Sequence, residues 1–98
     1  MPYIRTEKRE VLNPAIDEML NALRELESDD PQNSMAGNLN YIFTRLLDRA
    51  YTAPRYDDIN EAIGVLECCK LELYRRLAVP YEENKRFQNG DAYTTDQN

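Results

Sequence analysis

The chain has 98 residues, of which 31% are charged and 42% apolar, and its net charge is -6. This length suits one domain, and the apolar share is enough for a core. The acidic balance argues against a nucleic-acid partner, because nucleic-acid binding depends on a basic surface. The sequence contains neither a signal peptide nor the roughly 20 consecutive apolar residues of a membrane span, so we expect a cytoplasmic protein without a membrane partner.

The first predicted helix begins at Asn13-Pro14. Asparagine is a favoured N-cap, proline suits the first helical position, and acidic side chains follow in the first turn. Apolar residues then recur at helical spacing, so we expect the helix to end near Glu27, before the loop sequence SDDP at 28–31. Residues 6–12 offer only a short additional helical turn.

Two further segments have helical apolar spacing. The first spans 34–50. The second takes its N-cap from Asp57 or Asp58 and ends near Ala78, because the next residue precedes a proline and is biased out of the helical region. Its apolar positions cover an arc of about 180°, wider than the stripe of an ordinary surface helix. So wide an arc indicates contact with two helices of its own chain or with a second copy of the protein, and in so small a chain we favour the second copy.

The sequence therefore predicts an all-α fold. We expect a three-helix bundle built on an antiparallel helical hairpin, with a short fourth helix that begins at Pro80 and ends at Asn89-Gly90. Residues 1–93 form a single helical domain in this prediction, and 94–98 form a disordered C-terminal tail. The wide apolar arc adds the expectation that the domain is homo-oligomeric.

Residue types that carry catalysis or bind metals are scarce. The chain has no histidine, and its two cysteines, Cys68 and Cys69, are adjacent rather than spaced as a CxxC motif. It also has no phosphate-binding glycine loop. A magnesium-dependent phosphohydrolase would need carboxylate pairs on two facing helices, whereas the 34–50 segment offers only Asp48. We expect no enzymatic activity, no metal and no cofactor.

Polar side chains lie beside or within the apolar faces of the second and third predicted helices. On the second helix they recur at steps of three and four residues, and on the third a lysine falls inside the apolar arc. If the two helices fold as an antiparallel hairpin, these residues meet at one seam. The predicted ligand-binding set is Asn38, Tyr41, Arg45, Glu67, Lys70 and Tyr74.

Three interpretations of this set are open. A structural interpretation pairs Glu67 with Lys70 or Arg45 and has Tyr41 donate to Glu67, so that the cluster fixes how the hairpin packs. A functional interpretation makes it a site for a small anionic ligand, with the two cations supplying charge and tyrosine rings a stacking face. In the third interpretation the residues are simply a solvated polar face.

Four stretches of the sequence carry a family resemblance: GNLNYIFTRLL (37–47), YDDINEAIGVLECCKLELYRR (56–76), PYEENKR (80–86) and NGDAY (89–93). They resemble a small acidic protein family of bacteriophages and bacteria that has no assigned function. The resemblance implies a phage or bacterial cytosolic setting and transfers no catalytic residue. Short helical phage proteins often act by binding, either by blocking a host protein or by assembling into oligomers that sequester a signalling nucleotide.

These observations favour a non-enzymatic, homo-oligomeric binding protein of phage type that sequesters a small anionic or nucleotide ligand. The alternative is an inhibitor or adaptor that binds a host protein through an acidic, tyrosine-rich surface. Four of the seven tyrosines, Tyr51, Tyr56, Tyr81 and Tyr93, fall in or beside predicted loops and ends. Such rings either form a binding surface or cover the ends of a bundle.

Overall fold

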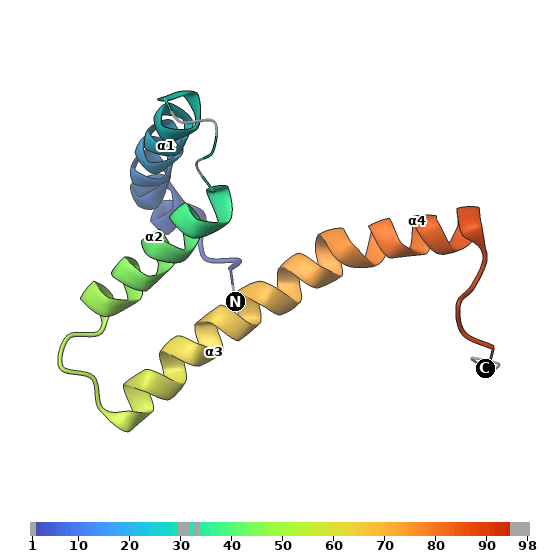
Figure 1. Ribbon diagram of the computed structural model, residues 1–98. Helices are drawn as coiled ribbons and strands as arrows, with labels where there is room; N and C mark the ends of the chain where they lie inside the picture. The colour runs from blue at the N-terminus through green and yellow to red at the C-terminus, as the bar shows by residue number, and fades with distance from the viewer. Residues whose placement is uncertain (1, 30–31, 33, 95–98) are drawn as a thin grey trace. The chain divides into compact units, whose positions relative to one another are not determined.

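The computed structural model, which describes residues 2–29, 32 and 34–94, confirms the all-α prediction (Figure 1). The chain comprises two compact units, residues 1–62 and residues 63–98. Of the predicted tail at 94–98, only Thr94 lies within the described residues. The elements in chain order are α1 at Thr6–Asp29, α2 at Met35–Ala50, α3 at Tyr56–Leu73, the π-helical turn η1 at Tyr74–Ala78, and α4 at Val79–Asn89.

Helix α1 runs through the proline that was expected to start it. It begins at Thr6, so the predicted start at Asn13 is wrong, and Pro14 lies inside the helix. A proline in a helix interior costs about 3 kcal/mol because it donates no hydrogen bond. Strong helix formers precede it, and Arg9 Nε donates to the Ile4 carbonyl at 2.7 Å, which anchors the first turn. The local helical preference therefore extends the helix past the proline.

The end of α1 also differs from the prediction. The helix continues to Asp29 and so takes in the first half of the predicted loop at 28–31, whose residues 30 and 31 lie outside the described part of the chain. Helix α2 matches its prediction. The side chain of Ser34 caps it by accepting a hydrogen bond from the Gly37 N–H at 3.1 Å, and the helix ends at Ala50 as expected.

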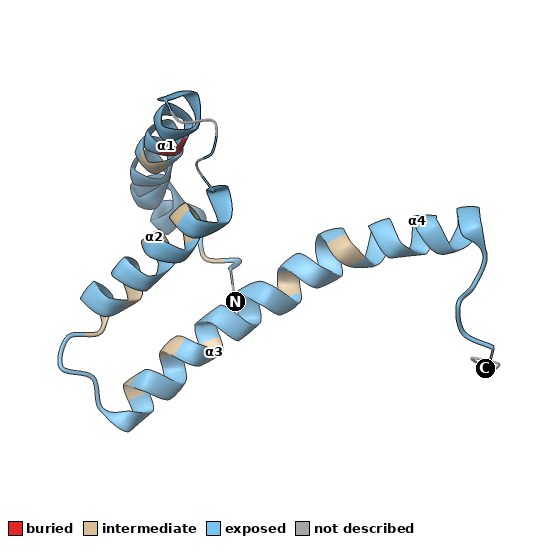
Figure 2. Cartoon of the chain, in the orientation of Figure 1, coloured by how far each residue is buried: buried red, intermediate tan, exposed pale blue. Residues whose placement is uncertain are grey.

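Helices α1 and α2 pack against each other in the 1–62 unit. Leu23 on α1 is 5% exposed and is the only buried residue in the described part of the chain (Figure 2). Met19 on α1 and Leu39 and Ile42 on α2 are half-buried. This small apolar contact is the core of the unit.

The start of α3 corrects the predicted cap at Asp57 or Asp58. Arg55 is the residue before the helix, and its carbonyl accepts the first helical hydrogen bond, from the Ile59 N–H at 3.0 Å. Asp58 lies inside the first turn, where its Oδ2 accepts from the Arg55 N–H at 3.0 Å. This is the backward half of a capping box, and it places a carboxylate at the positive end of the helix dipole.

The predicted helix end near Ala78 is also wrong, because α3 continues through η1 into α4 without a break. Val79 has helical φ and ψ angles of −60° and −52° although it precedes Pro80. Its N–H bonds to the carbonyl of Tyr74, five residues earlier, which makes the turn a π turn. The wider turn leaves room for the ring of Pro80, which would strike the preceding turn of a regular helix. The predicted fourth helix is therefore the last part of a longer one.

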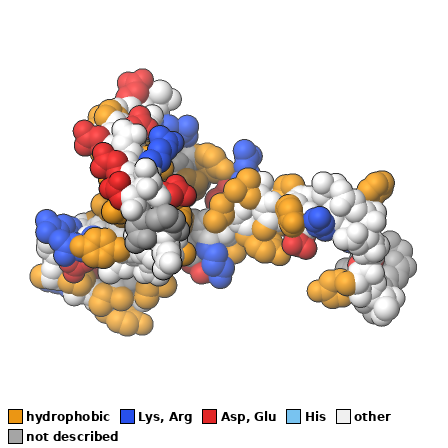
Figure 3. Space-filling model, turned by 45° about the horizontal axis from the view of Figure 1, so that its top comes forward, with side chains coloured by type: hydrophobic (Ala, Val, Ile, Leu, Met, Phe, Trp, Pro, Cys, Tyr) orange, Lys and Arg blue, Asp and Glu red, His pale blue; other side chains and the backbone are white. Residues whose placement is uncertain are grey.

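Most large apolar side chains are exposed. Leu77 is 64% exposed and Phe87 is 90% exposed, and hydrophobic side chains lie among the charged ones across the surface in view (Figure 3). The residues that the structure describes contain no core shared by three helices. The all-α class is thus established, whereas the three-helix bundle stays a prediction.

We expect Leu23→Ala to destabilise the 1–62 unit more than Leu26→Ala, a matched control on the same helix that is 48% exposed. Only the first substitution leaves a cavity between α1 and α2. The expected losses are about 2 kcal/mol for Leu23→Ala and under about 1 kcal/mol for Leu26→Ala, in urea unfolding followed by circular dichroism. Equal losses would contradict Leu23 as the main buried contact.

Candidate functional site

The first group of predicted site residues lies on α2, in the 1–62 unit. The guanidinium carbon of Arg45 is 5.9 Å from the centre of the Tyr41 ring, a cation–π distance. No described carboxylate lies within ion-pair distance of Arg45. Its guanidinium therefore retains donors for an anion, next to an exposed aromatic ring.

Asn38, one turn before Tyr41, has an unusual side chain. Its Nδ2 atom is buried and has no hydrogen-bond partner among the described residues. An unpaired buried donor costs about 1–3 kcal/mol. A water molecule or a ligand that accepted this hydrogen bond would remove that cost. Asn38 therefore adds a polar atom in need of a partner to the helix that carries Tyr41 and Arg45.

The second group lies on α3 and η1, in the 63–98 unit. The Lys70 Nζ and Glu67 Oε1 atoms form an ion pair at 3.1 Å, and the Lys70 side chain is 69% exposed. The position of Lys70 in the apolar arc therefore does not bury its charge in a single chain. A surface depression of about 530 Å³ lies beside it, lined mainly by apolar side chains: Lys70, Leu73, Tyr74, Leu77, Ala78, Tyr81 and Glu82.

The structure thus joins the predicted residues in two local pairs. Tyr41 lies with Arg45, and Glu67 lies with Lys70, which is one of the pairings that the structural interpretation predicts. Tyr74 shares the apolar depression with Lys70. The single six-residue cluster at a hairpin seam stays a prediction.

Residues 1–92 match the model of a protein family described as Domain of unknown function (DUF6899). The chain belongs to this family. No curated protein and no solved structure matches it. The matched range contains all six predicted site residues, and the description of the family names no function. The chemistry must be argued from the side chains themselves.

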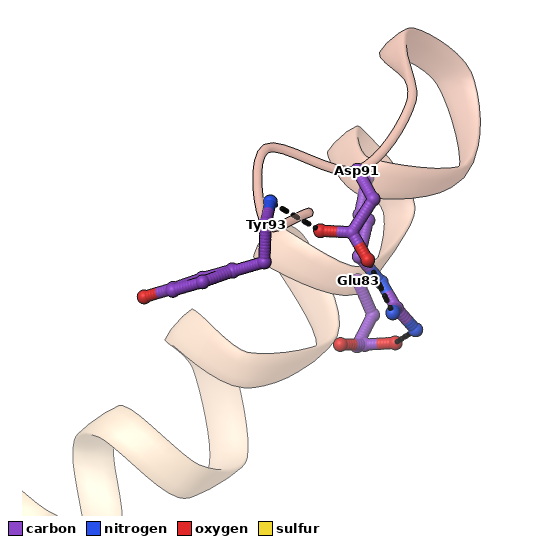
Figure 4. A network of polar contacts seen from close by, with 4 residues as sticks. Glu83, Asp91 and Tyr93 are labelled. Carbon is purple, nitrogen blue, oxygen red and sulfur yellow. Dashed lines mark hydrogen bonds and ion pairs between the residues drawn. The ribbon is translucent and has the colours of Figure 1, made fainter. Parts of the chain in front are cut away.

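This DUF6899 chain has a further polar network at the end of α4, which the sequence analysis missed (Figure 4). Arg86 binds Glu83 at 2.7 Å and Asp91 at 3.5 Å, and Asp91 accepts a hydrogen bond from the Tyr93 N–H at 2.9 Å. Gly90, with φ of 91°, ends the helix at the predicted place and turns the chain back. The hydrogen bond with Glu83 raises the pKa of Arg86. The guanidinium of Arg86 therefore already forms ion pairs with two carboxylates. It is less available to bind an anion than the guanidinium of Arg45.

Neither a metal site nor a membrane-spanning helix is found in the part of the DUF6899 chain that the structure describes. No group of three or more histidine, cysteine, aspartate or glutamate side chains is placed to hold a metal ion. None of the described helices is long and apolar enough to cross a membrane.

A last polar contact joins the end of α2 to α3 within the 1–62 unit. The hydrogen bond between Tyr51 and Glu61 raises the pKa of Tyr51 above its ordinary value of 10.0, and burial and the charges of Glu61 and Asp58 add to the shift. Because the folded protein favours the protonated phenol, this contact stabilises the fold fully below pH 10.0 and loses its effect as the pH rises through the folded pKa.

We expect Glu61→Ala to return the pKa of Tyr51 toward its ordinary value, because the substitution removes both the hydrogen-bond acceptor and the nearest negative charge. An NMR titration of ring-labelled tyrosine measures this pKa directly. Glu18→Ala, on α1, is the control and should leave the Tyr51 titration unchanged. A Tyr51 pKa that does not respond to Glu61→Ala would rule out the contact.

Proposed function

We propose that this protein is a non-enzymatic binding protein that works as a homo-oligomer. The observation that supports this most is the shortage of buried apolar surface, since only Leu23 is buried among the described residues. Burial of apolar area contributes about 25 cal/mol per Å² and is the main term that stabilises amphipathic helices. The exposed apolar faces contribute this stabilisation only when they pack against another surface. In this proposal, the three-helix bundle and its antiparallel hairpin are completed when copies associate.

The ligand in this proposal is small and anionic, of the nucleotide class. The Tyr41–Arg45 pair supports it, because a ring beside a guanidinium that forms no ion pair with a described carboxylate can stack on a base and bind a phosphate. The buried Asn38 Nδ2 atom, which has no hydrogen-bond partner among the described residues, adds a donor on the same helix. The family resemblance favours a phage-type setting in a bacterial cytoplasm, where sequestration of a signalling nucleotide is one way for such a protein to act.

The alternative function is binding to a host protein as an inhibitor or adaptor. The specific observation in its favour is the exposure of the tyrosines, five of which are more than half exposed on a chain with a net charge of -6. Exposed tyrosine is typical of protein-binding surfaces. This alternative expects residues 80–98 to be required for capture of a defined partner. The exposed tyrosines are Tyr41, Tyr56, Tyr74, Tyr81 and Tyr93.

Native mass spectrometry of the purified protein tests the first proposal. We expect a homo-oligomer that retains a small anionic molecule, because association covers the apolar faces and the site supplies free cationic donors. A strictly monomeric protein at micromolar concentration would contradict the oligomer.

We expect Arg45→Ala to weaken binding of the retained ligand, or of a nucleotide found by screening, by at least about tenfold, since a charge-assisted hydrogen bond contributes about 1.5–3 kcal/mol. Arg49→Ala removes the same charge from α2 at a position without the tyrosine contact, and is the matched control. Isothermal titration calorimetry gives both affinities. Equal weakening by the two substitutions would indicate a general charge effect and no site at Arg45.

A further inference from the structure

Five residues of the 63–98 unit repeat at alternating steps of three and four along α3 and η1. Ile63, Leu66, Leu73 and Leu77 are between 44% and 64% exposed, and Lys70 is the one charged member of the series. Steps of three and four residues are the spacing of the a and d positions of a coiled coil, which face a partner helix. We call these five residues the seam.

We propose that the seam binds a second copy of this chain in antiparallel orientation, with the two-fold axis level with Cys68. This inference rests on the proposed homo-oligomer and specifies its contact. In an antiparallel pair, a positions of one helix lie opposite d positions of the other. With this axis, Ile63 of one copy lies opposite Leu73 of the second copy, and Leu66 lies opposite Lys70 of the second copy.

Charge favours the antiparallel orientation over the parallel one. In a parallel, in-register pair, Lys70 would face Lys70 of the second copy, and two like charges at an interface repel each other. In the antiparallel pair, Lys70 faces Leu66 of the second copy and lies next to the Glu67 that follows it. The existing 3.1 Å ion pair already directs the Lys70 ammonium toward the Glu67 side of the helix. Two lysines and two glutamates then alternate around the axis.

A lysine in an apolar seam also has a physical role in this arrangement. Its alkyl stem can pack in the contact while its ammonium reaches the edge. A single lysine at an a position lowers the stability of a coiled coil, but it specifies orientation and oligomeric state. The ion pair with Glu67 would be worth little on the exposed surface of one chain. In the paired state the same charges select one orientation.

The π turn sets the end of the seam. A π turn inserts one residue into the helical repeat, so side chains after η1 are rotated by about 100° relative to those before it. Leu77 lies in η1 and is therefore the last seam residue. With the axis level with Cys68, Leu77 lies opposite Ile59 of the second copy, so the pairing is confined to the few turns from Ile59 to Leu77. We expect a dissociation constant in the micromolar range rather than a permanent dimer.

The two adjacent cysteines provide a native test of this register. Cys69 occupies a g position, and g positions of an antiparallel pair face each other across the interface, whereas Cys68 occupies the outward f position. Both thiols are free and exposed. We therefore expect a short bismaleimide to link two copies of the Cys68→Ser variant at least about tenfold faster than two copies of the Cys69→Ser variant. Denaturing electrophoresis of the covalent dimer measures the rates.

Charge substitutions test the orientation without a cross-linker. Lys70→Glu places four carboxylates around the axis and should weaken association at least about tenfold in sedimentation analysis. Adding Glu67→Lys to that variant restores alternating charges and should restore association, which a parallel pair could not do. Lys70→Leu should associate more tightly and lose the selectivity of Cys69 cross-linking, because nothing then disfavours the parallel pair.

The results separate this inference from the function on which it rests. An oligomer by native mass, without Cys69 selectivity or without rescue by the double substitution, would overturn the antiparallel seam and leave the homo-oligomer in place. A protein that is monomeric in native mass spectrometry and in sedimentation analysis would overturn both the antiparallel seam and the homo-oligomer. Circular dichroism of each variant shows whether the helices are retained, so that loss of association is not confused with unfolding.

Discussion

The constraint on which the rest of this structure depends is the small amount of apolar surface that the chain buries in itself. Ordering a residue costs about 1–2 kcal/mol of backbone entropy, and burial of apolar side chains is the main term that offsets it. Among the described residues, only Leu23 on α1 is buried. Helical propensity and caps stabilise the remaining helices only weakly. In the proposed homo-oligomer, exposed leucines such as Leu77 gain this stabilisation when a second copy covers them.

The sequence predicted helix location better than helix length. Ser34 and Gly90 mark real boundaries, because caps act through hydrogen bonds or backbone angles of their own few residues. Pro14 and Pro80 were expected at helix starts, and both lie within continuous helical segments. At Pro14 the preceding residues are strong helix formers. At Pro80 a π turn accommodates the ring, and apolar periodicity does not reveal a single inserted residue.

In the candidate site too, the contacts between neighbours on one helix were predictable from the sequence, and the contacts between helices were not. The Glu67–Lys70 and Tyr41–Arg45 pairs were predictable because residues three or four apart on a helix are neighbours whatever the tertiary structure. A cluster that spans two helices depends on how those helices pack, which spacing within each helix does not determine. The network around Arg86 was missed for a related reason, since it forms only after Gly90 turns the chain back toward α4.

The two local pairs are suited to different tasks. Lys70 already has a carboxylate partner, and in the antiparallel seam its charge would be balanced by glutamates of both copies. A cation so neutralised attracts an anionic ligand weakly, because each nearby carboxylate offsets its field. Arg45 has no such partner among the described residues and lies beside an aromatic ring. In the proposed function, association therefore belongs to α3 and anion binding to α2.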